Sequence, residues 1–210
     1  MSGKRLWIAV LSVVMLAGAL AAQDQKNDIG GSIGRFFLGT QGIQGANFFD
    51  PNIRYGKGLS VEGNYARRFY VAPLFAVAAE VPVVFNPDED VHAGGPGLVP
   101  GDYQAWFVTP SVRVNLFPTT AVSPWASVGG GFAHIGESGK LLYGGANTGK
   151  PTTSGVFQYG VGLDVKLTTR AVLRGEGRDF WAGEPDFPQA PTGKTRQHNY
   201  FLGVGIVWRF

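Results

Sequence analysis

The sequence ends in NYFLGVGIVWRF, residues 199–210, and every second side chain of this stretch is large and apolar. The apolar positions are Tyr200, Leu202, Val204, Ile206, Trp208 and Phe210. The positions between them are mostly small or polar toward the centre of the stretch. Because successive side chains of a β-strand point to opposite faces, the alternation predicts a strand with one apolar face that continues to the last residue.

This stretch closely resembles the C-terminal strand of bacterial outer-membrane β-barrels. In that family, the alternating apolar residues and the final aromatic residue are recognised by the outer-membrane assembly machinery. The resemblance implies that the six apolar positions, which end at Phe210, form an assembly signal. It also implies that the chain is located in the bacterial outer membrane, with lipid, lipopolysaccharide and the assembly machinery as its partners.

The N-terminal residues indicate export independently. The basic pair Lys4-Arg5 precedes the apolar run 6–16 and the small-residue site 19–21. A positive region, a short apolar region and small residues at the cleavage site are typical of a secretory signal peptide. We therefore expect a cleaved signal peptide over 1–22 and a single outer-membrane barrel domain over 23–210.

Composition narrows the possible partners. The formal net charge is +3, and loss of Lys4 and Arg5 with the signal peptide would reduce it to +1, which favours no nucleic-acid partner. There is no cysteine, so neither a disulfide nor a lipid-anchoring cysteine is available. The 32 glycines and the 13% aromatic content suit curved strands with aromatic belts better than they suit helices.

Alternating hydrophobicity predicts eight strands, at about 28–39, 58–67, 74–85, 104–116, 124–135, 154–167, 171–180 and 198–210. The connections between them alternate between long and short along the whole chain. Outer-membrane barrels have short periplasmic turns and long external loops. The predicted fold is therefore an all-β, eight-stranded, antiparallel up-and-down transmembrane β-barrel, expected to be monomeric.

Three places in the predicted strands depart from the regular pattern. The alternation is interrupted at residues 35–38, and Pro82 and Pro110 each remove a donor from the ladder of backbone hydrogen bonds. We therefore expect a bulge at 35–38 and a bulge or bend at each proline.

One face of the predicted strands is apolar and is assigned to lipid, as at Val112. Aromatic residues near the strand ends predict two belts at the membrane interfaces. The periplasmic belt contains Tyr65, Phe75, Trp125, Trp208 and Phe210, and the outer belt contains Phe85, Trp106, Phe157, Tyr159, Trp181 and Tyr200.

The opposite face is polar and is assigned to the barrel interior. It carries the acids Glu62, Glu80, Asp164 and Glu176 and the bases Arg113, Lys166, Arg174 and Arg178. Four acids and four bases predict a charged network of ion pairs, because buried charges of one sign are heavily penalised unless they have partners. Two interpretations of this network remain open: a polar plug that replaces a hydrophobic core, and a gated narrow pore in which the pairs exchange partners.

A second candidate site lies at the outer end of the fifth predicted strand, where His134, Glu137 and Ser138 occur close together. A serine, a histidine and a carboxylate can support acyl transfer or hydrolysis. The segment is loosely similar to eight-stranded lipid A deacylases, which implies lipid A acyl hydrolysis as an alternative function. In that family the serine follows the histidine by two positions, where this chain has Gly136, so we expect no catalytic residues.

Two further hypotheses concern a cation site in a loop and a different kind of β-barrel. Asp88, Glu89, Asp90 and His92 could bind a divalent cation, but they lack the spacing of a known calcium loop, and we expect neither a metal nor a cofactor. A secreted lipocalin-like ligand-binding barrel would also have eight strands and a signal peptide. Its apolar side chains would face inward, however, whereas eight charged residues occupy the predicted interior here.

Overall fold

The computed structural model describes residues 25–45, 52–56, 58–93, 99–142, 144–185, 187–188, 190–193 and 195–210. The predicted signal peptide, 1–22, lies outside the described residues. Within these ranges, no helix is long and apolar enough to cross a membrane.

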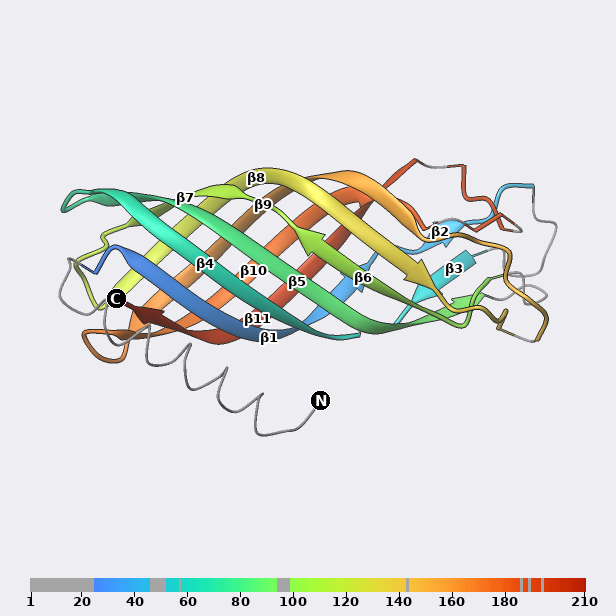
Figure 1. The fold of residues 1–210 in the computed structure, drawn as a ribbon, viewed down its shortest axis with the longest axis horizontal. Coiled ribbons are helices and arrows are strands. Elements are labelled where there is room, and N and C mark those ends of the chain that lie inside the picture. Colours follow the sequence, from blue (N-terminus) through green and yellow to red (C-terminus); the bar gives the residue numbers. More distant parts are fainter. Residues whose placement is uncertain are drawn as a thin grey trace, which may run out of the picture.

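The chain forms a closed β-barrel (Figure 1). The wall consists of β1 (Asn27–Leu38), β4 (Leu59–Val71), β5 (Phe75–Ala93), β6 (Asp102–Val108), β7 (Ser111–Leu116), β8 (Val122–Glu137), β9 (Thr152–Lys166), β10 (Ala171–Gly183) and β11 (Arg196–Arg209). β6 and β7 together form one interrupted strand between β5 and β8. Because β1 pairs with both β4 and β11, the sheet has no open edge, and the predicted eight-stranded antiparallel barrel is confirmed.

The strands are staggered around the barrel. Residues paired in turn from strand to strand are Asp28, Ala66, Glu80, Ser111, Gly129, Gln158, Phe180, Asn199 and finally Leu38. One circuit therefore returns to β1 ten residues beyond its start, from Asp28 to Leu38. Such a stagger requires tilted strands, and a barrel of eight strands is just wide enough for side chains to fill its interior.

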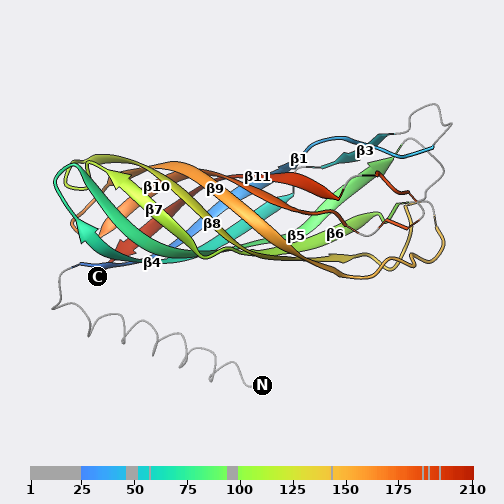
Figure 2. The ribbon, with the colours of Figure 1, turned by 90° about the horizontal axis from the view of Figure 1, so that it is seen from above.

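The two ends of the barrel differ (Figures 1 and 2). At the turn end, where the C-terminus lies, the strands are joined by the short connections 72–74, 117–121 and 167–170. At the loop end they are joined by the long connections 39–58, 94–101, 138–151 and 184–195. The short strands β2 (Gln41–Gly42) and β3 (Asn52–Tyr55) lie at the loop end, where β3 pairs with β5.

The bulge predicted at residues 35–38 is wrong. β1 keeps an unbroken register with β11 from Asp28 to Leu38, and Phe36 is buried inside the barrel while Arg35 is exposed. The alternation looked irregular in the sequence because the interior at this level is itself apolar.

The bulges considered at the two prolines are also absent. Pro82 pairs with Asn64 in an undisturbed register. Pro110 separates β6 from β7, but both pair with β5 and with β8 in the same register. A proline removes only its own donor, and the Pro110 carbonyl still accepts a hydrogen bond from the Gly130 N–H at 3.2 Å. The register shifts instead between Arg68 and Tyr70 and between Asn86 and Glu89.

The outer surface of the wall is apolar on every strand of the circuit. Val112 is 49% exposed, whereas the next residue, Arg113, is fully buried. The assignment of Trp125 to the periplasmic belt is wrong, because Trp125 is 3% exposed and lies inside the barrel, between the buried Ser123 and Ser127 of β8. Large contiguous apolar surfaces are rare on soluble monomers, so this wall is suited to lipid. A lipocalin would have an apolar interior around a ligand cavity, whereas the described interior here also carries buried charged side chains such as Glu80, Arg113 and Arg174.

Val112 tests the assignment of the lipid face. We expect Val112→Arg to lower the free energy of unfolding in bilayers by roughly 2–4 kcal/mol, since an arginine on the lipid face near the midplane must leave water. His92→Arg, at an exposed position of the loop end of β5, is the matched control and should change it little. Urea titrations of both variants in phospholipid vesicles make the comparison, and equal losses would mean that Val112 does not contact lipid.

Candidate functional site in the barrel interior

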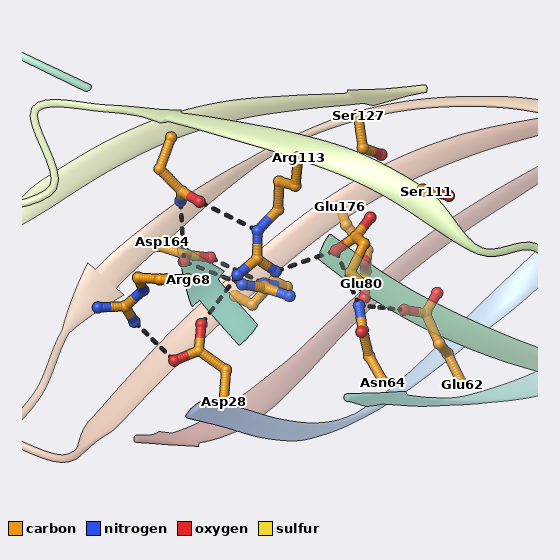
Figure 3. A network of polar contacts seen from close by, with 12 residues as sticks. Asp28, Glu62, Asn64, Arg68, Glu80, Ser111, Arg113, Ser127, Asp164 and Glu176 are labelled. Carbon is orange, nitrogen blue, oxygen red and sulfur yellow. Dashed lines mark hydrogen bonds and ion pairs between the residues drawn. The ribbon is translucent and has the colours of Figure 1, made fainter. Parts of the chain in front are cut away.

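The barrel interior contains a network of acidic and basic side chains (Figure 3). Its members are the carboxylates Asp28, Glu62, Glu80, Asp164 and Glu176 and the guanidinium groups Arg68, Arg113, Arg174, Arg178 and Arg209. Acids and bases are present in equal number, so their formal charges balance. Such balance is needed because an isolated buried charge is strongly disfavoured.

Arg178 is the most highly connected base. Its Nε lies 3.0 Å from Glu62 Oε2, its Nη1 lies 2.9 Å from Glu80 Oε1, and its Nη2 lies 3.1 Å from Glu176 Oε2. The three acids come from β4, β5 and β10. A single guanidinium therefore ties opposite parts of the wall together across the lumen.

Arg113 links this group to the turn end. It donates to Glu80 Oε2 at 3.1 Å, to Asp28 Oδ2 at 2.8 Å and to Asn115 Oδ1 at 3.0 Å. Asp28 also pairs with Arg68 at 2.6 Å. Since Glu80 binds both Arg113 and Arg178, the chain of ion pairs runs without interruption from Arg68 through Asp28 and Arg113 to Arg178.

Arg174 makes a bidentate pair with Asp164, with distances of 2.8 and 3.0 Å. The Trp125 ring lies beside this pair, and the guanidinium carbons of Arg174 and Arg178 are each 5.1 Å from a Trp125 ring centroid. These are cation–π distances, which strengthen when the groups are removed from water. Gly162, paired with Trp125, makes room for the ring, because a Cβ at that position would lie 2.4 Å from it.

The structure brings together seven of the eight predicted interior charges. Lys166 is the exception: it is partly exposed at the turn end, beside the short connection 167–170, and makes none of the ion pairs of the network. Its expected role belongs to Arg209, whose Nη2 lies 3.4 Å from Asp164 Oδ2. The sequence argument also missed Asp28 and Arg68, which lie at or just beyond the ends of the predicted strands 28–39 and 58–67, where alternation alone gives a weak signal.

A second layer, toward the loop end, is aromatic and was not predicted. The rings of Phe36, Phe107 and Phe180 are mutually close, with centroids 4.9–6.1 Å apart. Phe201 packs on Phe36 at 6.2 Å, and all four side chains are at most 1% exposed. In the sequence, each of the four is next to an aromatic residue that faces outward. Two adjacent aromatic residues were therefore the signal that could have predicted an inward ring.

The candidate hydrolytic set is not assembled. His134 is exposed on the outer face and its Nδ1 lies 2.8 Å from Thr153 Oγ1. Ser138 donates to the Lys140 carbonyl at 3.0 Å, and Glu137 accepts from Asn147 at 3.0 Å. No hydrogen bond joins any two of the three among the residues described, so the geometry gives no activated serine.

The acidic segment 88–92 belongs to β5, and its described side chains lie on opposite faces of that strand, while the side chain of Asp88 lies outside the described ones. Glu89 faces inward, where it accepts from Asn86 Nδ2 at 2.8 Å and from the Gly58 N–H at 3.0 Å. Asp90 and His92 are exposed on the other face of the strand. The described part of the chain contains no group of three or more histidine or acidic residues placed to hold a metal.

The loop end is itself packed beyond the aromatic layer. Tyr55 of β3 meets Tyr103 of β6 edge-on, with centroids 6.0 Å apart, and its hydroxyl donates to Gln41 Oε1 at 3.3 Å. Burial raises the pKa of the Tyr55 hydroxyl, so it stays a neutral donor. The barrel interior is therefore continued by side chains from β3 and β6.

Five of the six predicted assembly-signal residues share one face. Tyr200, Leu202, Val204, Ile206 and Trp208 are each 44–57% exposed on the outside of β11. Phe210 exchanges two backbone hydrogen bonds with Asn27, both at 2.9 Å, where the first and last strands meet. The C-terminal strand therefore presents its apolar face outward and closes the barrel at the same time.

The bidentate pair provides a stability test. We expect Arg174→Met to lower the free energy of unfolding by about 3–5 kcal/mol, because it leaves Asp164 buried with only the longer contacts to Arg209 and Asn115. Lys166→Met, outside the network, should shift it by about 0.5 kcal/mol or less. Equilibrium unfolding in vesicles followed by tryptophan fluorescence compares them. Equal effects of the two substitutions would show that the pair contributes nothing beyond a surface charge.

Comparisons with known proteins extend the description of the fold. No protein-family model and no curated protein matches the chain. Among solved structures, the outer membrane protein OprG from Pseudomonas aeruginosa aligns with a TM-score of 0.57 at 12% identity, over 88% of this chain and 96% of that one. Neisserial surface protein A aligns with a TM-score of 0.52 at 11% identity, over 88% and 97%. At these identities the likeness establishes the fold alone, and this chain has the fold of the small eight-stranded outer-membrane β-barrels.

Proposed function

We propose that this chain is an integral outer-membrane protein with a closed lumen, whose loop end faces the outside of the cell and carries a structural or surface-interaction role. The apolar outer wall and the outward face of β11 support the membrane location. The short connections at the turn end match the periplasmic turns of such barrels. Lipid, lipopolysaccharide and the assembly machinery are the proposed partners of a monomeric barrel.

The observation that carries this proposal is that two layers of side chains fill the lumen in series. The charged layer is centred on Arg113 and Arg178, both at most 2% exposed. The aromatic layer consists of Phe36, Phe107, Phe180 and Phe201, and lies toward the loop end. A permeating ion would have to separate guanidinium–carboxylate pairs and then pass between stacked rings.

The two layers oppose permeation for different reasons. In the charged layer, separating a pair leaves each ion without its partner in a region that has little water. In the aromatic layer, an ion finds no hydrogen-bonding group to replace its hydration shell. Because the barriers add in series, opening one layer leaves the other in place.

Planar-bilayer recording of the refolded protein tests the closed lumen. We expect no discrete openings from the wild type, from Phe107→Ala with Phe180→Ala, or from Arg178→Ala alone. Combining the three substitutions should produce steady conductance, because it removes both barriers.

Each variant is first checked for heat-modifiable migration, which reports a folded barrel. Discrete openings of the wild type that change when Arg113→Ala or Glu80→Ala is introduced would replace this proposal with a gated narrow pore.

The C-terminal ring tests the proposed assembly signal. We expect Phe210→Ala to reduce the amount of heat-modifiable protein in the outer membrane of expressing cells, since the backbone bonds to Asn27 are kept while the ring is lost. Phe210→Tyr retains an aromatic terminus and serves as the control. Unchanged insertion of Phe210→Ala would remove the final ring from the signal.

A further inference from the structure

A hollow of about 660 Å³ lies at the turn end of the barrel (Figure 1). It is bordered by the connections 117–121 and 167–170 and by the ends of β4 and β11. Its described lining contains three basic side chains and no acidic one; the bases are Arg68, Lys166 and Arg209. A hollow lined by charges of one sign concentrates ions of the opposite sign, so this one favours anions.

Two of the three bases are recessed, because the side chains of Arg68 and Arg209 are only 12% and 7% exposed. Arg68 pairs with Asp28 at 2.6 Å through its Nη2. Arg209 makes only long contacts, 3.8 Å from Nε to Asp28 Oδ1 and 3.4 Å from Nη2 to Asp164 Oδ2, and its Nε has no hydrogen-bond partner among the described residues. A guanidinium carries five N–H donors, so Arg209 keeps donors for a further acceptor.

The third base, Lys166, is the last residue of β9 and makes no ion pair or side-chain hydrogen bond with any residue that the structure describes. Thr168 lines the same hollow from the next connection. Its Oγ1 accepts the backbone N–H groups of Arg170 and Ala171 at 3.2 and 2.8 Å, so its own hydroxyl proton remains for an acceptor in the hollow. An ammonium group and a hydroxyl group therefore stand beside Arg209 with donors to spare.

The interior charges are also separated along the barrel axis. The deeper group combines one base, Arg178, with three acids, Glu62, Glu80 and Glu176. Toward the turn end there are five bases and two acids: Arg68, Arg113, Lys166, Arg174 and Arg209, with Asp28 and Asp164. Positive formal charge is therefore in excess at the hollow, where an anion would offset it.

We propose that this hollow binds a phosphate group, carried by a soluble phosphate ester or by a phospholipid headgroup, and that Lys166, Thr168 and Arg209 hold it. The ammonium supplies a point charge, the guanidinium supplies parallel N–H donors that match phosphate oxygens, and the hydroxyl supplies one more donor. The periplasm as the side from which the phosphate enters rests on the proposed orientation of the barrel.

Phosphate suits the hollow better than carboxylate does. A phosphate monoester carries about two negative charges and three acceptor oxygens, whereas a carboxylate carries one charge and two oxygens. The three donor groups come from different parts of the chain and so approach the anion from different sides. Apolar side chains in the same lining fit a short organic group attached to the phosphate; these are Val71, Pro118 and Leu167.

Calorimetric titration of the refolded protein in octyl glucoside with glycerol 3-phosphate tests the site. We expect Lys166→Gln to weaken binding about tenfold, as for loss of a charged hydrogen bond. Lys166→Arg keeps the charge and should retain most of the affinity. Because Lys166 takes no part in the ion-pair network, both variants should fold, which heat-modifiable migration checks.

Two controls separate the site from a general effect of charge. Arg67→Gln removes one charge from an exposed position of β4 at the same end, outside the hollow, and should leave the affinity unchanged. Glycerate, which has a carboxylate in place of the phosphate, should bind the wild type more weakly than glycerol 3-phosphate does. Equal losses in Lys166→Gln and Arg67→Gln, or equal affinities for the two ligands, would overturn the phosphate site.

A second arm identifies the source of the phosphate. Native mass spectrometry of the barrel released from phosphatidylcholine nanodiscs with added phosphatidylglycerol shows whether that lipid is retained. Retention that depends on Lys166 would assign the site to a headgroup, and retention without such dependence, with glycerol 3-phosphate still bound, would assign it to a soluble ester. If neither ligand depends on Lys166, the site is overturned.

The proposed membrane function is read separately, from insertion of the wild type into phosphatidylcholine vesicles. Failure to insert would count against that function without affecting the titration in detergent. A correctly inserted barrel that binds no glycerol 3-phosphate and retains no phosphatidylglycerol would overturn the phosphate site and leave the membrane function standing.

Discussion

Inside a bilayer, every backbone N–H and C=O group needs a partner within the protein, and the remaining features of this structure follow from that requirement. The eight-strand circuit meets it by pairing β1 with β11 over eleven residue pairs, from Asp28 with Arg209 to Leu38 with Asn199. Closure then creates an outer and an inner surface, which require different side chains. The outer one must be apolar, and the inner one is narrow enough to be filled completely by side chains.

The type of side chain that fills the interior differs along the barrel axis. Near the turn end it is ionic, and the ion pairs are shared so that Glu80 and Asp164 each bind two arginines and Asp28 binds three. Toward the loop end it is aromatic, and it continues into the side chains of Tyr55 on β3 and Tyr103 on β6. The interior therefore combines a polar core with a conventional hydrophobic one, and both consist of closely packed side chains.

Much of this arrangement could be predicted, because a period of two is imposed on every strand by the contrast between lipid and interior. The strand order, the outward face and seven interior charges follow from that contrast. The prediction fails where inward and outward residues are alike. The inward phenylalanines are as apolar as their outward neighbours. Trp125 resembles a belt residue in sequence, although its ring lies beneath two arginines inside the barrel. Choosing Arg209 over Lys166 required the register, which alternation does not specify.

The contact between Trp125 and Gly162 has a consequence for how this barrel can vary over evolution. The Trp125 ring lies directly against the backbone of Gly162, so it occupies the space that a side chain at position 162 would need. A larger residue there would displace the indole and, with it, the surface on which Arg174 and Arg178 rest. In homologous chains, a glycine at the position of Gly162 should therefore accompany a large ring at the position of Trp125, so that the two sites change together or not at all.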